Sequence, residues 1–402
     1  MRTQRIEITN RHKQKLSARL ELPVDQKPHN FALFAHCFTC NKDLSIVRNI
    51  SNALTQAGFG VMRFDFTGLG SSSGDFADTS FANNVQDIID VAQYLDEHYR
   101  LPTLMVGHSL GGAAAIVAAA QMDSIQAVAT IGAPASVGHV AHLFDQHLEE
   151  INESGKAEVS IGGRNVSIGK EFIDDLRTKD VLKITKSLKK PIFIAHSPQD
   201  TVVEIENASS LYQAAHHPKS FLSLDGADHM LSNPKDSIYV GSVLASWAMR
   251  YVEIDKTTLP KTNLQVVAHL ADEGYTTHIK AGNHTLVADE PTSVGGNDFG
   301  PSPYEFISAG LGACTAMTLR MYANRKKWNL EGVNVHLEHN KEHHIDCETC
   351  NEKPQQIDVF NRVIEIEGDL TTEQKNRLLE IADKCPVHKT LHNQVIINTK
   401  LK

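Results

Sequence analysis

The stretch TLMVGHSLGG (residues 103–112) combines an apolar run, a serine between glycines and the start of an alanine-rich segment. The apolar residues before Gly107 predict a buried strand, and the alanines after Gly112 predict a helix. The glycines around Ser109 allow a tight turn between the two elements, which exposes the serine hydroxyl at the carboxyl end of the strand. This context predicts a nucleophilic serine, provided that the chain also supplies its partners.

Two further residues are suited to activate this serine. Asp200 follows the apolar run PIFIAHS (191–197), and His229 follows the next expected strand. Because parallel strands end at one edge of a sheet, the order Ser109, Asp200, His229 predicts that the three side chains meet there. His229 would accept the serine proton, and Asp200 would fix the imidazole tautomer and stabilise the imidazolium. Asp228 is a rival acid, although its place directly before His229 makes it hard for its carboxylate to face that ring.

An oxyanion formed during attack on an acyl group would need two backbone N–H donors. One is expected at Leu110, next to the nucleophile. The second is expected in the loop after the strand FALFAH (31–36), at Phe38 or its neighbour Cys37. Cys37 and Cys40 also form a Cys-x-x-Cys pair here; ordinary loop cysteines are the favoured interpretation, and oxidative modulation of the serine site is the alternative.

Residues 1–252 alternate short apolar strands with amphipathic helices. Strands without polar alternation, separated by helices, predict an α/β fold with a mostly parallel sheet and helices on both faces. The segment at about 138–190 is polar and longer than a sheet connection needs, which predicts an inserted lid, with a surface excursion as the alternative. The expected strands are 31–36, 60–66, 103–107, 125–133, 191–197 and 219–225, and the expected helices are 44–57, 80–99, 110–122 and about 236–251.

After a linker at 253–262, the element order of residues 263–402 changes to α+β. Antiparallel-looking strands come first, followed by a long helix, a pair of strands, a second helix with a capping signature and a last strand. The expected strands are 264–270, 275–281, 284–289, 333–338, 356–367 and 395–400, and the expected helices are 303–324 and 371–384.

Two cysteines of this second part are candidates for thiol chemistry. Cys314 lies in a helix of small residues, which would let another helix or a partner subunit approach closely. Cys385 lies at a helix start, where the N-terminus together with Lys384 and His388 would stabilise a thiolate. Their separation of 71 positions is neither a Cys-x-x-Cys nor a zinc spacing. It fits a peroxide-attacking thiolate with a distant resolving thiol, and two inert core cysteines are the alternative.

The first part of the chain, over about residues 5–252, resembles the α/β-hydrolase family. The resemblance implies a small ester, thioester or related acyl substrate and no cofactor for hydrolysis. A scaffold that has lost its activity and serves as a docking domain is the alternative. Cys37 departs from the usual glycine after the histidine and places a side chain where the oxyanion loop is normally smallest. The residues that carry the resemblance are His36-Cys37-Phe38, RFDFTGLGS (63–71), Gly107–Gly112, Asp200 and His229.

The second part, over about residues 262–402, resembles the OsmC/Ohr family in GPSPYEFISAGLGAC (300–314) and DKCPVH (383–388). The resemblance implies reduction of organic hydroperoxides, in which Cys314 attacks the peroxide, Cys385 condenses to a disulfide and a dithiol reductant restores the pair. It also implies an intertwined homodimer with sites at the subunit interface. Glu305 is near the family's glutamate position, although Tyr304 matches that column. Together the two parts resemble bacterial fusions of a hydrolase with an OsmC domain.

Peroxide-reducing members of that family use an arginine from the early strands to lower the thiol pKa. This chain has no arginine between Tyr251 and Leu319. Lys280, Arg320, a histidine or a partner-chain group are the candidate substitutes. Two other functions therefore stay open: a hydrolase whose OsmC-like part only dimerises it or binds metal, and a non-enzymatic stress or ligand-binding protein.

A histidine- and cysteine-rich run, VHLEHNKEHHIDCETC (335–350), is a candidate metal site. Its Cys-x-x-Cys, Cys347 and Cys350, follows the adjacent histidines His343 and His344, a donor set that suits zinc or another soft metal. The alternative is a solvated hairpin whose histidines are polar surface residues.

Composition narrows the partners and the compartment. A formal charge of −9 gives no electrostatic reason to expect nucleic acid or an anionic membrane as a partner. The most apolar run, Gly111–Ala120, is too short for a membrane span. Six cysteines in 402 residues are not a disulfide scaffold. With no apolar signal segment at the N-terminus, reduced thiols and a cytoplasmic location are expected.

Overall fold

The computed structural model describes residues 1–37, 40–136, 147–161, 164–254, 259–271, 274–343 and 356–401. It divides the chain into two compact units, Met1–Thr257 and Thr258–Lys402. Within the described residues, no helix is both long and apolar enough to cross a membrane.

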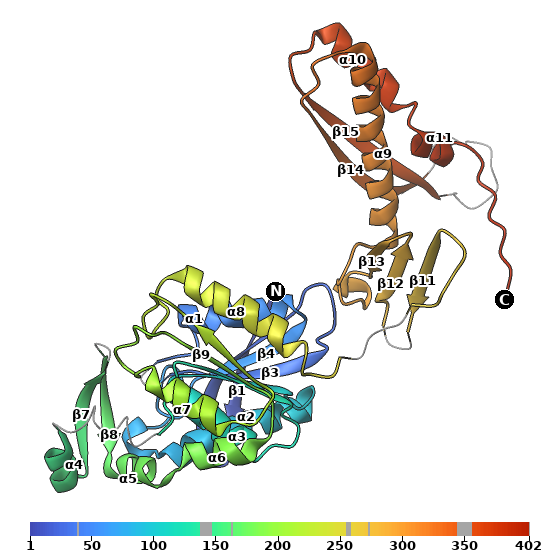
Figure 1. Cartoon of the computed structure of the whole chain (residues 1–402). Helices are drawn as coiled ribbons and strands as arrows, with labels where there is room; N and C mark the ends of the chain where they lie inside the picture. The colour runs from blue at the N-terminus through green and yellow to red at the C-terminus, as the bar shows by residue number, and fades with distance from the viewer. Residues whose placement is uncertain are drawn as a thin grey trace. The chain divides into compact units, whose positions relative to one another are not determined.

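The first unit is built on one eight-stranded sheet, with strand order β1-β2-β4-β3-β5-β6-β9-β10 (Figure 1). The six strands from β4 to β10 in this order are parallel, whereas β1 and β2 join one edge antiparallel. The strands are β1 (Arg2–Thr9), β2 (Lys15–Leu22), β3 (Asn30–Ala35), β4 (Phe59–Phe64), β5 (Leu104–His108), β6 (Ala127–Ile131), β9 (Ile192–His196) and β10 (Lys219–Ser223).

Helices cover both faces of this sheet (Figure 1). Helices α1 (Ser45–Gln56) and α8 (Pro234–Ala248) pack on one face. The other face carries α2 (Phe81–His98), α3 (Leu110–Ala119), α6 (Val181–Leu188) and α7 (Glu206–Ala214). The central strands are buried at every position, because their side chains alternate between two apolar cores. The predicted α/β architecture is confirmed.

An insertion between β6 and β9 corresponds to the segment that the sequence marks as a lid. It contains α4 (Leu148–Ser154), the hairpin β7 (Lys156–Ile161) and β8 (Arg164–Gly169), and α5 (Lys170–Thr178). Phe172 of α5 packs edge-on against Phe76 of the 3₁₀ turn η1 (Phe76–Asp78), with ring centroids 5.2 Å apart. Residues 138–146, 162 and 163 of the predicted lid lie outside the described residues, so its closing role stays a prediction.

The second unit has the predicted α+β composition. Strands β11 (Val266–Leu270), β12 (Thr277–Ala281) and β13 (His284–Ala288) form one antiparallel sheet. Helix α9 (Pro303–Lys326) packs along the hairpin of β14 (Gly332–His343) and β15 (Gln356–Glu367), followed by α10 (Thr372–Ala382) and α11 (Pro386–His392). The start of α9 is fixed by a capping box in which Ser302 and Glu305 bond to each other's backbone N–H. The small core contains Leu319, Ala323, Leu330, Leu378, Ile381 and Ala382.

The last strand predicted, at 395–400, is wrong. These residues have no strand geometry, and Val395, Ile396 and Ile397 are 56%, 78% and 84% exposed. A run of β-branched residues becomes a strand only where a neighbouring strand satisfies its backbone groups. None of the strands that the structure describes pairs with it.

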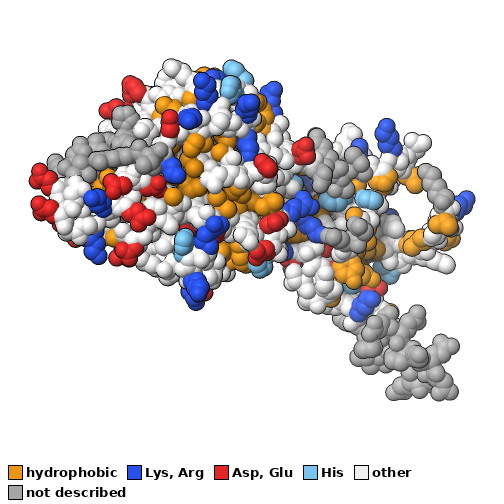
Figure 2. Space-filling model, turned by 90° about the horizontal axis from the view of Figure 1, so that it is seen from below, with side chains coloured by type: hydrophobic (Ala, Val, Ile, Leu, Met, Phe, Trp, Pro, Cys, Tyr) orange, Lys and Arg blue, Asp and Glu red, His pale blue; other side chains and the backbone are white. Residues whose placement is uncertain are grey.

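The surface mixes charges of both signs. On the face shown in Figure 2, lysine and arginine side chains are interspersed with aspartate and glutamate side chains. The formal charge of −9 is therefore the difference between 48 acidic and 39 basic side chains of the whole chain.

Candidate active sites

Ser109 lies in a strained turn between β5 and α3. Its φ of 56° and ψ of −130° are unusual for a residue with a side chain. A Cβ on Gly107 would lie 2.3 Å from the Gly111 oxygen, and a Cβ on Gly111 would lie 2.2 Å from the His36 oxygen. The two glycines are therefore required for the close packing that forms the turn.

The structure brings Ser109, His229 and Asp200 together at the carboxyl ends of the parallel strands. His229 Nε2 lies 2.9 Å from Ser109 Oγ, and His229 Nδ1 lies 2.7 Å from Asp200 Oδ2. The other carboxylate oxygen of Asp200 accepts the N–H groups of Val202 and Val203, both at 2.9 Å. Burial alone would raise the pKa of Asp200, but the His229 hydrogen bond and these backbone donors hold it below the usual value. Asp200 is therefore ionised and faces the imidazole.

The rival acid Asp228 is turned away from this arrangement. Its Oδ1 accepts the N–H of Ser232 at 2.9 Å, four residues further along the same loop. Asp200 is thus the carboxylate that contacts His229.

Two buried histidines that the sequence analysis did not single out support the loops of this site. His108 Nε2 lies 2.8 Å from the carbonyl oxygen of His229, and His196 Nε2 lies 2.8 Å from that of Val203. Burial lowers the pKa of both imidazoles, and the nearby His229 helps to lower the pKa of His108 to about 3. Both rings are therefore neutral and donate Nε2–H to these carbonyls. Each histidine is the last residue of its strand, β5 or β9, and this position could have indicated from the sequence that it lies near the site.

The expected oxyanion donors are only partly visible. Leu110 is the first residue of α3, so its N–H has no acceptor within the helix. Phe38 lies outside the described residues. Cys37 is buried and forms a disulfide with Cys40, which contradicts the expectation that these thiols are reduced. The loop brings their Cα atoms to 5.4 Å, a separation that suits a disulfide.

The segment that follows this loop is held by buried charged groups, which the sequence analysis also missed. Lys42 donates to Asp65 twice, from its backbone N and from Nζ, each at 2.6 Å. Arg63 donates to the carbonyl oxygen of Lys42 and to Glu21. All four residues are buried, so the loop is fixed to β4 and β2 by charge-assisted hydrogen bonds.

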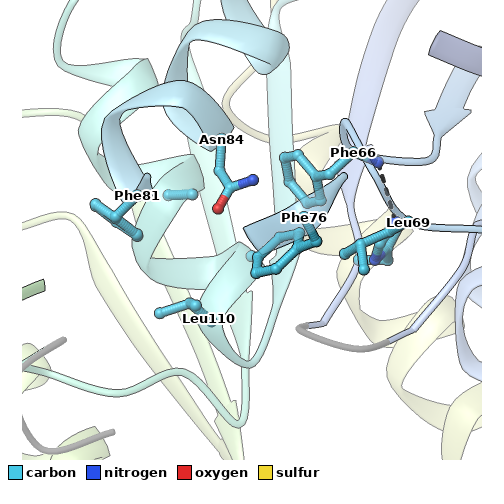
Figure 3. Close-up of a pocket in the computed structure, with 9 residues that line it drawn as sticks. Phe66, Leu69, Phe76, Phe81, Asn84 and Leu110 are labelled. Atoms are coloured by element: carbon cyan, nitrogen blue, oxygen red, sulfur yellow. Dashed lines mark hydrogen bonds between the residues drawn. The ribbon is translucent and has the colours of Figure 1, made fainter. Parts of the chain in front are cut away.

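An apolar pocket lies beside Leu110 (Figure 3). Phe66 and Phe76 lie close to the carboxamide of Asn84, whose Nδ2 has no hydrogen-bond partner although it is buried. The pocket is lined by His36, Phe66, Leu69, Phe76, Phe81, Asn84, Leu110, Gly111 and Ala114. It therefore borders both the turn of Ser109 and the end of β3.

In the second unit, Cys314 of α9 and Cys385, which precedes α11, are hydrogen-bonded to each other. Burial raises the pKa of Cys314, and its neighbour Cys385 raises it further. Burial would also raise the pKa of Cys385. However, hydrogen bonds from Cys314, from the backbone N–H groups of His388 and Val387 and from Thr315 lower it below the usual value.

Glu305 does not join the cysteine pair within this chain. Its Oε2 accepts the N–H of Ser302 at 2.7 Å as part of the helix cap. Nine helical positions separate it from Cys314, a rise of roughly 13 Å along α9. Arg320 also points elsewhere, because it donates to the carbonyl oxygens of Leu330 and Glu331.

The predicted metal site lies almost entirely outside the described residues. His344, Cys347 and Cys350 are not described, and only the backbone of His343 is. In the described parts of the chain, no group of three or more His, Cys, Asp or Glu side chains is arranged to hold a metal. The nearby His339 instead bonds to Asp358 at 2.9 Å and stacks on Tyr304.

The parallel sheet, the strained turn and the Ser–His–Asp geometry define the first unit as an α/β-hydrolase domain. Residues 40–153 match the family described as serine aminopeptidase, S33, and residues 295–400 match the OsmC-like proteins. The esterase domain of a Rhodothermus marinus protein is 45% identical, over 62% of this chain and 99% of that one, with a TM-score of 0.54.

Est1E from Butyrivibrio proteoclasticus, solved with ferulic acid bound, shares the fold at 22% identity, over 61% of this chain and 98% of that one, with a TM-score of 0.55. Comparison with curated proteins gives no match. The chain belongs to the α/β-hydrolase family and is a fusion of an esterase-like α/β-hydrolase domain with an OsmC-family domain.

Proposed function

We propose that the first unit hydrolyses carboxylic esters or thioesters with Ser109 as the nucleophile. The observation that carries this proposal is the unbroken hydrogen-bond chain from Asp200 through His229 to Ser109 Oγ. Such a chain is what a serine needs to become nucleophilic near neutral pH.

The geometry gives each residue a step in the reaction. His229 takes the proton of Ser109 as Oγ attacks the acyl carbon, and the ionised Asp200 stabilises the resulting imidazolium. The N–H of Leu110 donates to the oxyanion. His229 then protonates the leaving alkoxide or thiolate. A water molecule, activated by the same imidazole, releases the acid and restores Ser109.

The pocket beside Leu110 supports a compact, largely apolar acyl group. Its aromatic and aliphatic side chains would contact such a group next to the N–H that would hold the oxyanion (Figure 3). The unpartnered Nδ2 of Asn84 would donate a hydrogen bond to one acceptor atom on that group.

Hydrolysis of short p-nitrophenyl esters tests the proposal. We expect activity in the native chain and a fall of roughly 10⁴-fold or more in kcat for Ser109→Ala. Ser187→Ala, at an exposed serine of α6, is the matched control and should retain full activity. A native chain without esterase activity, or an active Ser109→Ala variant, would overturn the proposal.

We also propose that the second unit reduces organic hydroperoxides with Cys314 and Cys385. The direct contact between the two thiols supports this function over two separate core cysteines. The sulfur of one cysteine attacks the peroxide and the O–O bond breaks. The sulfur becomes a sulfenic acid, and the rest of the peroxide is released as an alcohol. The second thiol then forms a disulfide and releases water, and a dithiol reductant restores both thiols.

Thiol titration with one equivalent of cumene hydroperoxide tests this second activity. We expect the native chain to lose two thiols per chain. A Cys314→Ser/Cys385→Ser variant should lose none of its remaining thiols. Peptide mapping that finds both cysteines still reduced in the native chain would exclude the peroxidase and favour an inert pair.

We further propose that two copies associate through the second unit. Its helix α9 exposes Met317 and Met321 by 65% and 72%, and their i, i+4 spacing places them on one face. Light scattering should give about twice the chain mass of 44.3 kDa. Met317→Glu/Met321→Glu should give the single-chain mass, whereas a native monomer would contradict the dimer.

A further inference from the structure

Arg362 of β15 connects the two segments that carry the cysteines. Its Nη1 donates to Thr315 Oγ1 at 3.0 Å and to the Ala382 carbonyl oxygen at 3.3 Å. Its Nη2 donates to Asp383 Oδ1 at 2.7 Å. Thr315 directly follows Cys314, and Ala382 and Asp383 lie just before Cys385. The guanidinium therefore holds both ends of the thiol pair in place.

The positive charge of Arg362 is weakly screened by water, because the residues around it are buried. The Arg362 side chain is only 13% exposed, and Thr315 and Cys385 are fully buried. Charges interact more strongly in such surroundings than in water, because few water dipoles screen them. Asp383 balances the guanidinium from the solvent side, since its own side chain is 64% exposed.

The Thr315 hydroxyl contacts both the guanidinium of Arg362 and the thiol of Cys385. Its oxygen accepts from Arg362, and its single hydrogen points to the carbonyl oxygen of Leu311 at 2.8 Å. That carbonyl is part of α9 and has the helical N–H of Thr315 as a second donor. The hydroxyl can therefore turn its hydrogen to Cys385, with which Thr315 is in hydrogen-bonding contact.

The other arginines of the second unit are engaged elsewhere or lie on its surface. Arg320 binds the Leu330 and Glu331 carbonyls, and Arg377 binds Tyr322 and Glu380. Arg325 is exposed near the end of α9. Of the four arginines after the linker, all of which the structure describes, Arg362 bonds to residues beside both cysteines.

We propose that Arg362, acting through the hydroxyl of Thr315, is a positioning residue that keeps the negative charge of the thiol pair on Cys385. The groups in contact with this sulfur are Cys314 and Thr315 of α9 and the N–H groups of Val387 and His388. The guanidinium lies one hydrogen bond further away, on the Thr315 hydroxyl. Lys384 and His388 flank Cys385 in sequence. Cys314 keeps its proton and donates a hydrogen bond to the Cys385 thiolate. The inference deepens the proposed peroxide reduction, because it makes Cys385 the attacking sulfur in place of Cys314, which the family resemblance implies.

Titration of the thiolate ultraviolet absorbance in the full-length chain tests this role. Cys347→Ser/Cys350→Ser serves as the background, and the signal of Cys385 is the difference on adding Cys385→Ser. Arg362→Met should raise the titration midpoint by about one pH unit, because it removes the charge. Thr315→Val should raise it in the same direction, and Thr315→Ser, which restores the hydroxyl, should return it.

Asp383→Asn provides the decisive contrast. It removes the counter-charge of Arg362, so it should lower the midpoint, in the direction opposite to that of Arg362→Met. A purely structural role of Arg362 predicts no such downward shift. Unchanged midpoints in Thr315→Val and Asp383→Asn would overturn the inference, even if Arg362→Met failed to fold. Shifted midpoints in a chain that does not consume peroxide would instead reject the proposed peroxidase and leave the role of Arg362 standing.

Discussion

His108 shows how a residue that need not touch the substrate can shape the active site. Its Nε2–H holds the carbonyl oxygen of His229, and only a neutral imidazole fits its buried position. The pKa of His108 is about 3 in the folded chain and about 6.5 in the unfolded chain. Between these pH values, the unfolded chain binds a proton at His108 and the folded chain does not. Its contribution to stability is complete above about pH 6.5 and is lost as the pH falls toward about 3.

This linkage predicts an acid-dependent loss of stability. From His108 alone, the free energy of unfolding should fall by about 2 kcal/mol between about pH 7.5 and pH 5. His108→Gln should remove most of that pH dependence, whereas His12→Gln, at an exposed histidine, should not. Urea unfolding followed by Trp247 fluorescence, in a Trp328→Phe background, measures it. Equal slopes with pH for His108→Gln and the native chain would contradict the prediction.

The histidine and cysteine cluster at 343–350 remains a prediction from residue chemistry alone. We propose that His343, His344, Cys347 and Cys350 bind one zinc ion. Elemental analysis of dialysed protein should find about one zinc per chain, and Cys347→Ser/Cys350→Ser should lose it. Metal-free native protein would reject the site.

Residues of the serine site differ in how far the sequence could predict them. Ser109, Asp200 and His229 follow the parallel strands β5, β9 and β10 of one sheet, so all three are expected at the same edge of that sheet. The support from His108 to His229 joins positions 121 apart, and the Lys42–Asp65 pair joins positions 23 apart. Such contacts depend on how loops pack, which local patterns do not encode.

Among the elements of the first unit, the loop after β3 carries a disulfide next to the proposed active site. Cys37 and Cys40 are joined within it, and Lys42 and Asp65 hold its far end. Opening the disulfide would remove a constraint on Cys37, one of the two residues expected to supply an oxyanion donor.

This loop predicts that ester hydrolysis depends on reduction. A dithiol reductant should lower kcat of the native chain. The fall should be at most about 100-fold, which is the effect of losing one oxyanion donor. Cys40→Ser should have the lower kcat from the start and show no further response to reductant. Stopped assays with p-nitrophenyl esters measure both, and a native kcat that reductant leaves unchanged would reject the link.

Element boundaries were predictable where local chemistry sets them. The start of α9 at Pro303 and that of α10 at Thr372 follow from capping side chains within three residues. The failed strand at 395–400 has suitable residues but no pairing strand in the described chain. Short helix α7 (Glu206–Ala214) escaped prediction because its apolar pattern spans little more than two turns.

At the scale of the whole molecule, each unit has its own hydrophobic core and sheets. Units that stabilise themselves separately should keep separate activities. Cys314→Ser/Cys385→Ser should therefore leave ester hydrolysis within about twofold of native, and Ser109→Ala should leave peroxide-driven thiol loss unchanged. Parallel assays of both activities on each variant check this. A large loss of one activity after inactivating the other site would show that the two sites are coupled.

Covalent labelling with a fluorophosphonate is the sharpest test of the serine site, because the reagent reacts with an activated serine hydroxyl. We expect one adduct in the first unit, located at Ser109 by peptide mapping and abolished by His229→Ala. An unlabelled native chain, or an adduct at a different serine, would contradict the assignment of Ser109, His229 and Asp200 as the catalytic site.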